Sequence, residues 1–262
     1  MPRVVGRKDN LNDQNRKFEQ VPLGQPVFLN SVPKCGTHLF RNIVRMFVPV
    51  EQQYHQMYIQ IPVLQKHLAA FSKSKPRLSW GHLLFTDTSA IALRDVNHTV
   101  LVRDPYTWVL ARARFFLSDT FQGSMEHLKG GSANMEDVLN MMIFGIHDKS
   151  PPMKDIFMHN GAAWLGTSAK LLKMEELVQA VKNLDADDSE EYFSRVFGYC
   201  GIKTLPDDWR ERVRIGSDRK QSATARENLA GQEAGVPDEL PDEQKRLVNF
   251  AIPGLRELLG YY

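Results

Sequence analysis

The residues best placed to do chemistry stand where an apolar run, residues 27–29, gives way to Pro33-Lys34-Cys35-Gly36-Thr37-His38. Apolar residues then recur at helical spacing from Leu39, which predicts a strand, a loop and a helix in direct succession. The unpaired N–H groups and the positive dipole end of such a helix attract an anion. Gly36 permits close backbone approach, Thr37 offers a hydroxyl, and Lys34 can follow negative charge onto a leaving oxygen. These residue types also occur in ordinary strand-to-helix turns, so the loop alone leaves a structural interpretation open.

Two familiar phosphate-loop chemistries can be weighed against this segment. A Walker loop is excluded because no Gly-Lys-Ser or Gly-Lys-Thr occurs and the lysine precedes the glycine. A cysteine-dependent phosphatase would use Cys35 and Arg41, which are separated by five residues, and a helix N-terminus beside Lys34 should lower the thiol pKa. Against that alternative, the helix has already begun at Leu39, where an anion cradle needs exposed N–H groups.

A second strand-to-helix loop follows about 70 residues later. The apolar run 99–102 leads into Arg103-Asp104-Pro105, and proline suits the first turn of a helix. Arg103 is therefore a second candidate anion-binding residue, although Arg-Asp at a strand end can also be a local ion pair. Between the two loops, His82 ends the strand-like segment 78–82. A histidine with a pKa near 6.5 can act as a general base, but a histidine beside apolar residues is more often a core group.

The elements that must position these residues alternate along the chain. Strands are expected at 27–29, 78–82, 99–102 and 170–173, and the first, third and fourth are followed by a helical pattern. Alternation of this kind predicts an α/β fold with a mainly parallel central sheet, P-loop-like, in three α/β/α layers. The loops after the strands then meet at one carboxyl edge, where open α/β sheets bind ligands.

Composition limits the remaining possibilities. The chain has 262 residues, a net charge of +2 and 42% hydrophobic residues, typical of one globular domain without a charge bias toward nucleic acid or membranes. Its two cysteines, Cys35 and Cys200, provide no disulfide framework and no zinc site, and no run of about 18 apolar residues occurs. We therefore expect a soluble cytoplasmic protein without a metal.

The domain organisation is expected to be simple. Residues 1–20 are charged and lack apolar periodicity, so they are predicted to be a solvated, disordered arm before a single domain over 21–262. Residues 123–134 and 216–237 are expected to be loops, the second basic and mobile. Helical spacing over 242–259 predicts a closing helix kinked at Pro253.

Taken in order, these motifs resemble those of the sulfotransferases that use 3′-phosphoadenosine 5′-phosphosulfate (PAPS). Pro-Lys-Cys-Gly-Thr resembles the family's 5′-phosphosulfate loop, usually Pro-Lys-Ser-Gly-Thr, and Val102-Arg103-Asp104-Pro105 resembles its 3′-phosphate motif. Ser79-Trp80-Gly81-His82-Leu83 is similar to the strand end that carries the family's catalytic histidine, and Arg219-Lys220-Gln221 resembles the start of its Arg-Lys-Gly loop. The resemblance covers most of residues 26–262, strongly at the two loops and weakly elsewhere.

Several positions depart from the family pattern. Leu39 replaces a tryptophan that packs near the adenine, and Ala111 replaces a serine that grips the 3′-phosphate. Loss of that hydroxyl removes a hydrogen bond to a charged group, worth roughly 1.5–3 kcal/mol. Met174 stands where the family has tyrosine, and Gln221 where it has glycine.

The resemblance implies a sulfuryl transfer from PAPS to a hydroxyl or amine of a small-molecule acceptor, with 3′,5′-bisphosphoadenosine (PAP) as product. His82 would be the base and Lys34 would stabilise the leaving group. The donor would be held by residues of both loops and the basic segment: Lys34, Cys35, Gly36, Thr37, His38, Arg103, Arg219 and Lys220. Two segments line an acceptor pocket or belong to the core: the one between the first loop and His82, with Tyr54, His55, Met57 and Tyr58, and the stretch from Met141 to Phe157. A PAP-binding module without catalysis and the Cys35 phosphatase remain the alternatives.

Overall fold

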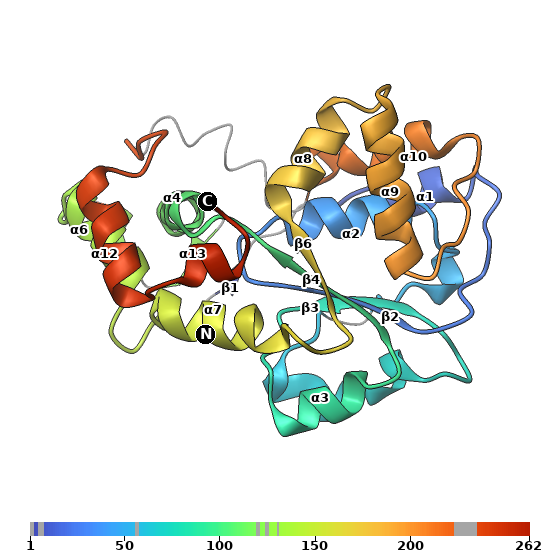
Figure 1. The fold of residues 1–262 in the computed structure, drawn as a ribbon, viewed down its shortest axis with the longest axis horizontal. Coiled ribbons are helices and arrows are strands. Elements are labelled where there is room, and N and C mark those ends of the chain that lie inside the picture. Colours follow the sequence, from blue (N-terminus) through green and yellow to red (C-terminus); the bar gives the residue numbers. More distant parts are fainter. Residues whose placement is uncertain are drawn as a thin grey trace.

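The protein is described here by a computed structural model that covers residues 3–4, 8–55, 58–118, 121–123, 126–129, 131–222 and 235–262. A parallel four-stranded sheet in the order β3-β2-β4-β6 forms its centre (Figure 1). Its strands are β2 (Val27–Ser31), β3 (Leu78–Gly81), β4 (Asn97–Val102) and β6 (Lys170–Lys173). A separate antiparallel pair joins β1 (Arg3–Val4) to β5 (Phe121–Gln122).

Twelve labelled α-helices and four 3-10 helices accompany these strands in the described part of the chain. They are α1 (Leu11–Asn15), α2 (Thr37–Arg45), α3 (Asp87–Leu93), α4 (Pro105–Leu117), α5 (Glu126–Lys129), α6 (Met135–Phe144), α7 (Met153–Asn160), α8 (Met174–Lys182), α9 (Asp187–Tyr199), α10 (Trp209–Ser217), α12 (Asp242–Ala251) and α13 (Leu255–Leu258), with η1 (Val50–Gln52), η2 (Ile61–Phe71), η3 (Ala162–Trp164) and η4 (Arg219–Gln221).

Helices cover the sheet on both sides. Figure 1 shows α2, α8, α9 and α10 above the strands and α3 below them, while α4, α6, α12 and α13 gather beyond the end of β4. This arrangement confirms the predicted α/β class and three-layer architecture, and β6 has the predicted bounds. Every residue of β2 is buried, as expected for a parallel strand covered on both faces.

The strand order creates a switch point beside β2. The chain passes from β2 to β3 on one side and then crosses to β4 on the other, and both pairings are parallel. Ser31 of β2 lies opposite Leu101 of β4, so the two strands end at the same level. Open α/β sheets bind ligands in the crevice at such a point, because the loops diverge there.

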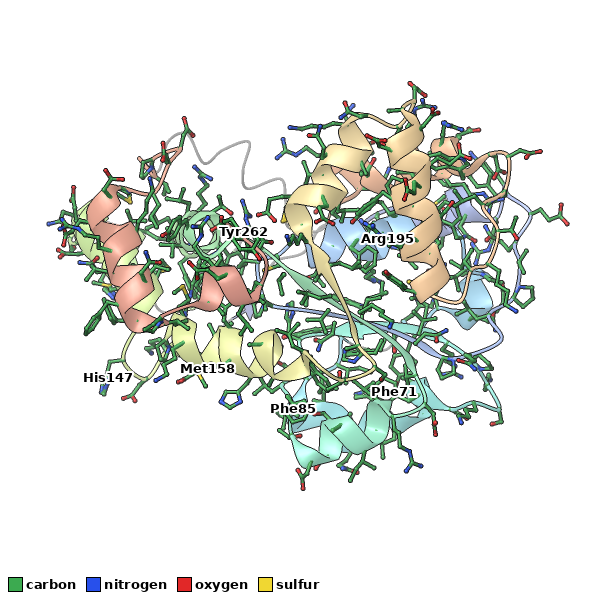
Figure 2. All side chains as sticks on the ribbon, in the orientation of Figure 1. Phe71, Phe85, His147, Met158, Arg195 and Tyr262 are labelled. Carbon is green, nitrogen blue, oxygen red and sulfur yellow. The ribbon has the colours of Figure 1, made fainter. Side chains whose placement is uncertain are left out.

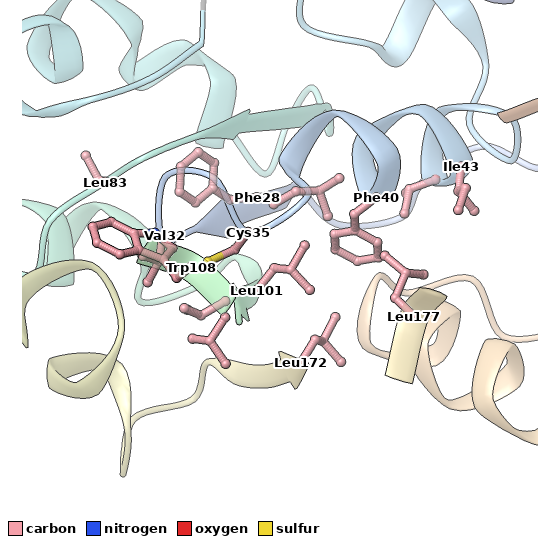
Figure 3. Close-up of a cluster of buried hydrophobic side chains, with 14 of the residues drawn as sticks. Phe28, Val32, Cys35, Phe40, Ile43, Leu83, Leu101, Trp108, Leu172 and Leu177 are labelled. Carbon is pink, nitrogen blue, oxygen red and sulfur yellow. The ribbon is translucent and has the colours of Figure 1, made fainter. Parts of the chain in front are cut away.

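One hydrophobic core lies between the layers, and it includes the first loop. Figure 3 shows the Cys35 sulfur among Val32, Leu101 and Trp108. The side chains of Cys35 and Trp108 are both fully buried. Within the described residues, no helix combines the length and the apolar character needed to cross a membrane.

The prediction of a solvated arm over residues 1–20 is wrong for the part that the structure describes. Leu11 of α1 is fully buried, and the Asn15 side-chain amide donates to the Arg45 carbonyl at 2.7 Å and the Val48 carbonyl at 3.1 Å. Asn15 therefore binds carbonyl groups that the end of α2 leaves unpaired. The contact comes from distant residues, so local periodicity did not reveal it.

Two further expectations need correction. The closing helix is broken rather than kinked, because α12 ends at Ala251 and α13 starts at Leu255, after Pro253. The segment 123–134 contains the short helix α5. The expected loop at 216–237 begins with the end of α10 and η4, and its residues 223–234 lie outside the described residues.

Gly81 provides a direct test of how the edge of the sheet is packed. A Cβ at Gly81 would stand 1.9 Å from the Ile59 carbonyl oxygen. The Ile59 backbone is held in place, because its N–H donates to the Trp80 carbonyl and its carbonyl accepts from the His82 N–H. We expect Gly81→Ala to lower the free energy of unfolding by about 1–3 kcal/mol or more, because backbone must move.

Gly198 in α9 is the matched control, because an added Cβ meets nothing within 4 Å there. Gly198→Ala should raise the stability by up to about 1 kcal/mol through helix propensity. Urea unfolding of both variants measures the difference, and equal stabilities would contradict the packing at Gly81.

Candidate functional site

The first loop begins with a tight turn. The Cys35 N–H donates to the Val32 carbonyl at 3.2 Å, and Lys34 has a φ of +68°. Proline at the second position of such a turn and a positive φ at the third are typical of a type II turn, where glycine or asparagine is usually preferred at the third. A non-glycine residue held there costs on the order of 1–3 kcal/mol, and such strain is frequent in ligand clamps.

The loop then passes directly into α2. Gly36 has a φ of +86° and is the N-cap residue, and the Phe40 N–H makes the first helical bond, to the Gly36 carbonyl at 3.0 Å. The N–H groups of the first turn, from Thr37 on, therefore have no acceptor within the helix. Met174 packs over the other side, with its sulfur 3.0 Å from where a Cβ of residue 36 would be. The geometry is that of an anion site with a glycine at the point of closest approach.

The second loop lies beside the first. Arg103 Nε donates to the Thr107 hydroxyl at 2.9 Å, which holds the guanidinium against the first turn of α4. The Asp104 carboxylate caps α4 by accepting from the Tyr106 N–H at 2.9 Å, and it also pairs with Arg256 at 2.9 Å. Burial lowers the pKa of Arg103, an effect that the Glu175 carboxylate opposes.

Glu175 and the chain end hold this second loop from outside. One Glu175 carboxylate oxygen accepts from the Asp104 N–H at 3.0 Å, and the other accepts from the Tyr261 hydroxyl at 2.8 Å. Lys173 Nζ donates to the Gly260 carbonyl at 2.7 Å. The last residues of the chain are therefore fixed to the end of β6 and to the start of α4.

Trp108 connects the two loops. Its indole N–H donates to the Pro33 carbonyl at 2.6 Å, which joins α4 to the turn before α2. Lys34 Nζ lies 3.5 Å from the centre of the Phe115 ring, also on α4. Lys34 and Arg103 therefore stand on the same edge of the sheet, as the sequence analysis requires.

His82 follows β3 at that edge, and its neighbours define its protonation. Nδ1 is 2.9 Å from the Ser31 carbonyl oxygen, which can only accept, so the neutral ring carries its hydrogen on Nδ1 and a lone pair on Nε2. The Ser31 hydroxyl also lies 3.1 Å from Nδ1 and 2.6 Å from the Thr37 hydroxyl. Burial lowers the pKa of His82 to about 4, the bond to Ser31 opposes this, and the charge of Lys34 lowers it further. The ring is a neutral hydrogen-bond acceptor at pH 7.

The structure corrects the expected state of Cys35. Burial raises the pKa of this thiol well above its usual value, and this effect outweighs the nearby charges of Arg103 and Lys34. The side chain has no exposed surface. Arg41, the partner that a phosphatase would need, lies with its guanidinium 4.4 Å from the Trp80 ring centre. The geometry therefore argues against a thiolate nucleophile.

Other candidates from the sequence occupy varied positions. The His38 ring packs against Trp80 with 5.3 Å between centres. Arg219 and Lys220 lie in η4, whose last residue, Gln221, connects it to α2. The Gln221 carbonyl accepts from the Asn42 side-chain amide at 3.3 Å. Their role toward a ligand stays a prediction.

Sequence reasoning missed three residues that organise the site. Ser31 orients His82 through its carbonyl, Trp108 links the loops, and Glu175 braces the second loop. The signals were weak: a serine at a strand end, a tryptophan in a helix and a glutamate in a helix start. Only the folded structure brings these three residues to the same edge of the sheet.

Comparisons with known proteins agree with this architecture. The structure of mouse sulfotransferase SULT7A1 complexed with PAP is similar, with a TM-score of 0.59 and 12% sequence identity, over 94% of this chain and 88% of that one. No family model matches the chain, and no curated protein matches it. The chain therefore has a sulfotransferase fold, as the motif resemblance predicted.

The buried histidines predict a pH dependence of stability. Burial lowers the pKa of His38 to about 3, of His82 to about 4 and of His98 to about 3, all below the ordinary value of 6.5. Between pH 6.5 and 4 the unfolded chain therefore binds more protons than the folded protein. The contribution of the three histidines to the free energy of unfolding is therefore complete above pH 6.5. As the pH falls toward 4, that free energy decreases by about 1.4 kcal/mol per pH unit for each histidine.

Urea unfolding at pH 7, 6 and 5 measures this slope. His98 is the variant of choice because it lies in the core against Trp164, away from the two loops. His98→Leu should flatten the slope by about one histidine's share. A wild-type stability that stays constant between pH 7 and 5 would contradict the buried, neutral state of these rings.

Proposed function

We propose that the protein transfers a sulfuryl group from PAPS to a hydroxyl or amine of a small-molecule acceptor. The observation that carries this proposal is the bond from the Trp108 indole to the Pro33 carbonyl, because it fixes the two anion-binding loops beside each other. A nucleotide with phosphate groups at both its 5′ and 3′ positions fits two such loops. The likeness to a sulfotransferase solved with PAP supports the same choice.

The donor would bind across the switch point. The backbone of residues 35–38 and the Thr37 hydroxyl would hold the 5′-phosphosulfate at the start of α2, with Lys34 adding a cation. Arg103, held by Thr107, would bind the 3′-phosphate, and Arg219 and Lys220 would add charge from η4. Fixed positive charge of this kind lowers the barrier where negative charge develops on the leaving oxygen.

The acceptor would be activated by His82. Because Nδ1 donates to the Ser31 carbonyl, Nε2 is the atom that would take the acceptor's proton. A pKa of about 4 makes this a weak base in the unliganded protein. A bound polyanion would offset the charge of Lys34 and raise that pKa, so the base would strengthen when the donor is present.

The low basicity of His82 also favours one alternative, a PAP-binding protein without transferase activity. Ala111 and Met174, which depart from the family pattern, fit that alternative as well. The two buried free thiols, Cys35 and Cys200, support a reducing compartment, which we propose to be the cytoplasm.

Nucleotide binding is tested with PAP against AMP, which lacks the 3′-phosphate. PAP at 100 times its dissociation constant should stabilise the protein by about 2.7 kcal/mol, a shift of roughly 5–10 °C in melting temperature. AMP at equal concentration should give a much smaller shift. Arg103→Met should reduce the effect of PAP to that of AMP.

Arg94→Met serves as the control because the Arg94 side chain is 80% exposed at the end of α3. It should respond to PAP like the wild type. An equal response of the wild type to AMP and PAP would show that no 3′-phosphate site exists.

Catalysis is tested at His82. His82→Asn should slow sulfuryl transfer from PAPS by about 10²–10⁴-fold, because the proton acceptor is lost, and leave PAP affinity unchanged. The control is His147→Asn, since this histidine lies on the surface after α6 (Figure 2) and its side chain is 97% exposed. Transfer within threefold of the wild type in His82→Asn would remove the base from the mechanism. PAP binding without transfer by the wild type, to any acceptor, would support the non-catalytic alternative.

A further inference from the structure

Two arginines one turn apart on α2 have very different surroundings. The Arg45 guanidinium donates to the Asp9 carboxylate at 2.9 Å and to the Gln53 side chain at 3.2 Å, and it also bonds to Asn12. Arg41 contacts the Trp80 ring at 4.4 Å and, within the described residues, has no hydrogen bond and no ion pair. Burial lowers the pKa of Arg41 to about 10, and the charge of Arg45 contributes in the same direction.

No carboxylate of the described residues forms an ion pair with Arg41. Asp9 is the acidic group that acts on it electrostatically, but one Asp9 oxygen accepts from Arg45 and the other from the Leu11 N–H at 3.0 Å. Like charges four residues apart also disfavour a helix. The Arg41 guanidinium is half-buried and carries five N–H donors, which make no hydrogen bond to the described residues and are therefore available to a ligand.

Next to Arg41, the His38 imidazole also has a nitrogen atom without a hydrogen bond to the described residues. The Nδ1 atom of His38 is buried without a hydrogen-bond partner in the described structure, and its ring also packs on Trp80. Burial lowers the pKa of His38 to about 3, with Arg41 as the next cause, so this ring is neutral at pH 7. Arg41 and His38 Nδ1, neither with a hydrogen bond to the described residues, therefore share one indole surface.

This cluster adjoins the candidate base. The Tyr58 ring, 37% exposed, lies 5.5 Å from the Trp80 ring and 5.9 Å from the His82 ring. Trp80 belongs to β3, whereas Arg103 follows β4, and these strands flank β2 on opposite sides. The cluster is therefore on the side of His82 and away from the proposed 3′-phosphate site.

Resting on the sulfuryl transfer proposed above, we propose that Arg41, with His38 and Trp80, forms a subsite for a negatively charged group of the acceptor. The acceptor class is then a hydroxyl or amine compound that also carries a carboxylate or a phosphate. Guanidinium binds either group through charge-assisted bonds, and the indole fixes the plane of the guanidinium. Such a cation also offsets the repulsion between an acidic acceptor and the anionic donor.

The first test is the stability of the unliganded protein. Arg41→Met should fold and raise the melting temperature by about 2–4 °C, because a guanidinium with no ion pair to the described residues is replaced by an apolar chain of similar length. Arg45→Met, the matched variant one turn away, should lower it. A destabilisation by Arg41→Met as large as that by Arg45→Met would show that Arg41 is structural and would overturn the proposal.

The second test uses two probes that differ only in charge, 3-(4-hydroxyphenyl)propionate and its amide, titrated into the PAP-saturated protein. The acid should bind at least about tenfold more tightly, and Arg41→Met should remove that preference. Arg94→Met should keep it. Equal binding of the two probes to the wild type, including no binding of either, would overturn the subsite.

A PAP titration without acceptor separates this inference from the proposed function. PAP affinity should be the same in the wild type and in Arg41→Met. A weaker affinity in Arg41→Met would mean that the nucleotide itself occupies this cation, which overturns the acceptor subsite. Failure of the wild type to bind PAP would instead contradict the proposed function, and the stability comparison would still report on Arg41.

Discussion

The structure of the site depends on the bond between the Trp108 indole and the Pro33 carbonyl. Adjacent parallel strands bring the ends of β2 and β4 to one level, but strand pairing alone does not fix the loops that follow. The fully buried indole does so, because it ties the strained turn at Lys34 to the helix that begins after Arg103. Two separate loops thereby become one surface, on which a ligand with two anionic groups can be held. Nearer the strands, the Val32 N–H donates to the Leu101 carbonyl at 3.0 Å, and the Trp108 bond extends this connection to the loop itself.

The same edge concentrates features that oppose stability. Lys34 has a left-handed backbone conformation, the His82 ring is desolvated and therefore neutral, and Arg41 has no acidic partner among the described residues. Proteins tolerate such costs where a ligand relieves them, so their location together supports a binding site more strongly than any one alone. The remainder of the edge is braced from outside, since Glu175 joins the second loop to the chain end through Tyr261.

Local sequence patterns were sufficient for the four strands of the central sheet and for the two loops, but not for several helices, among them α1 and α5. Apolar runs located all four strands of the central sheet, and the Pro-Lys and Arg-Asp-Pro segments located the loops. What failed depended on distant residues. The thiol of Cys35 was expected to ionise easily at a helix start, but burial by Trp108 and Leu101 dominates its pKa (Figure 3). The burial of residues near Leu11 was missed because the partners of Asn15 at the end of α2 lie 30 and 33 positions away. The contact between Arg41 of α2 and Trp80 of β3 likewise could not be predicted from the local sequence, because the two residues lie on different elements.

The most direct measurement is a crystal structure of the protein with PAP. The 5′-phosphate should lie against the N–H groups at the start of α2, near Lys34 and Thr37, and the 3′-phosphate against Arg103, with the Trp108 to Pro33 bond intact between them. His82 Nε2 should face the 5′ end of the nucleotide. A nucleotide bound elsewhere, or one that engages only one of the two loops, would contradict the central claim that they form a single site.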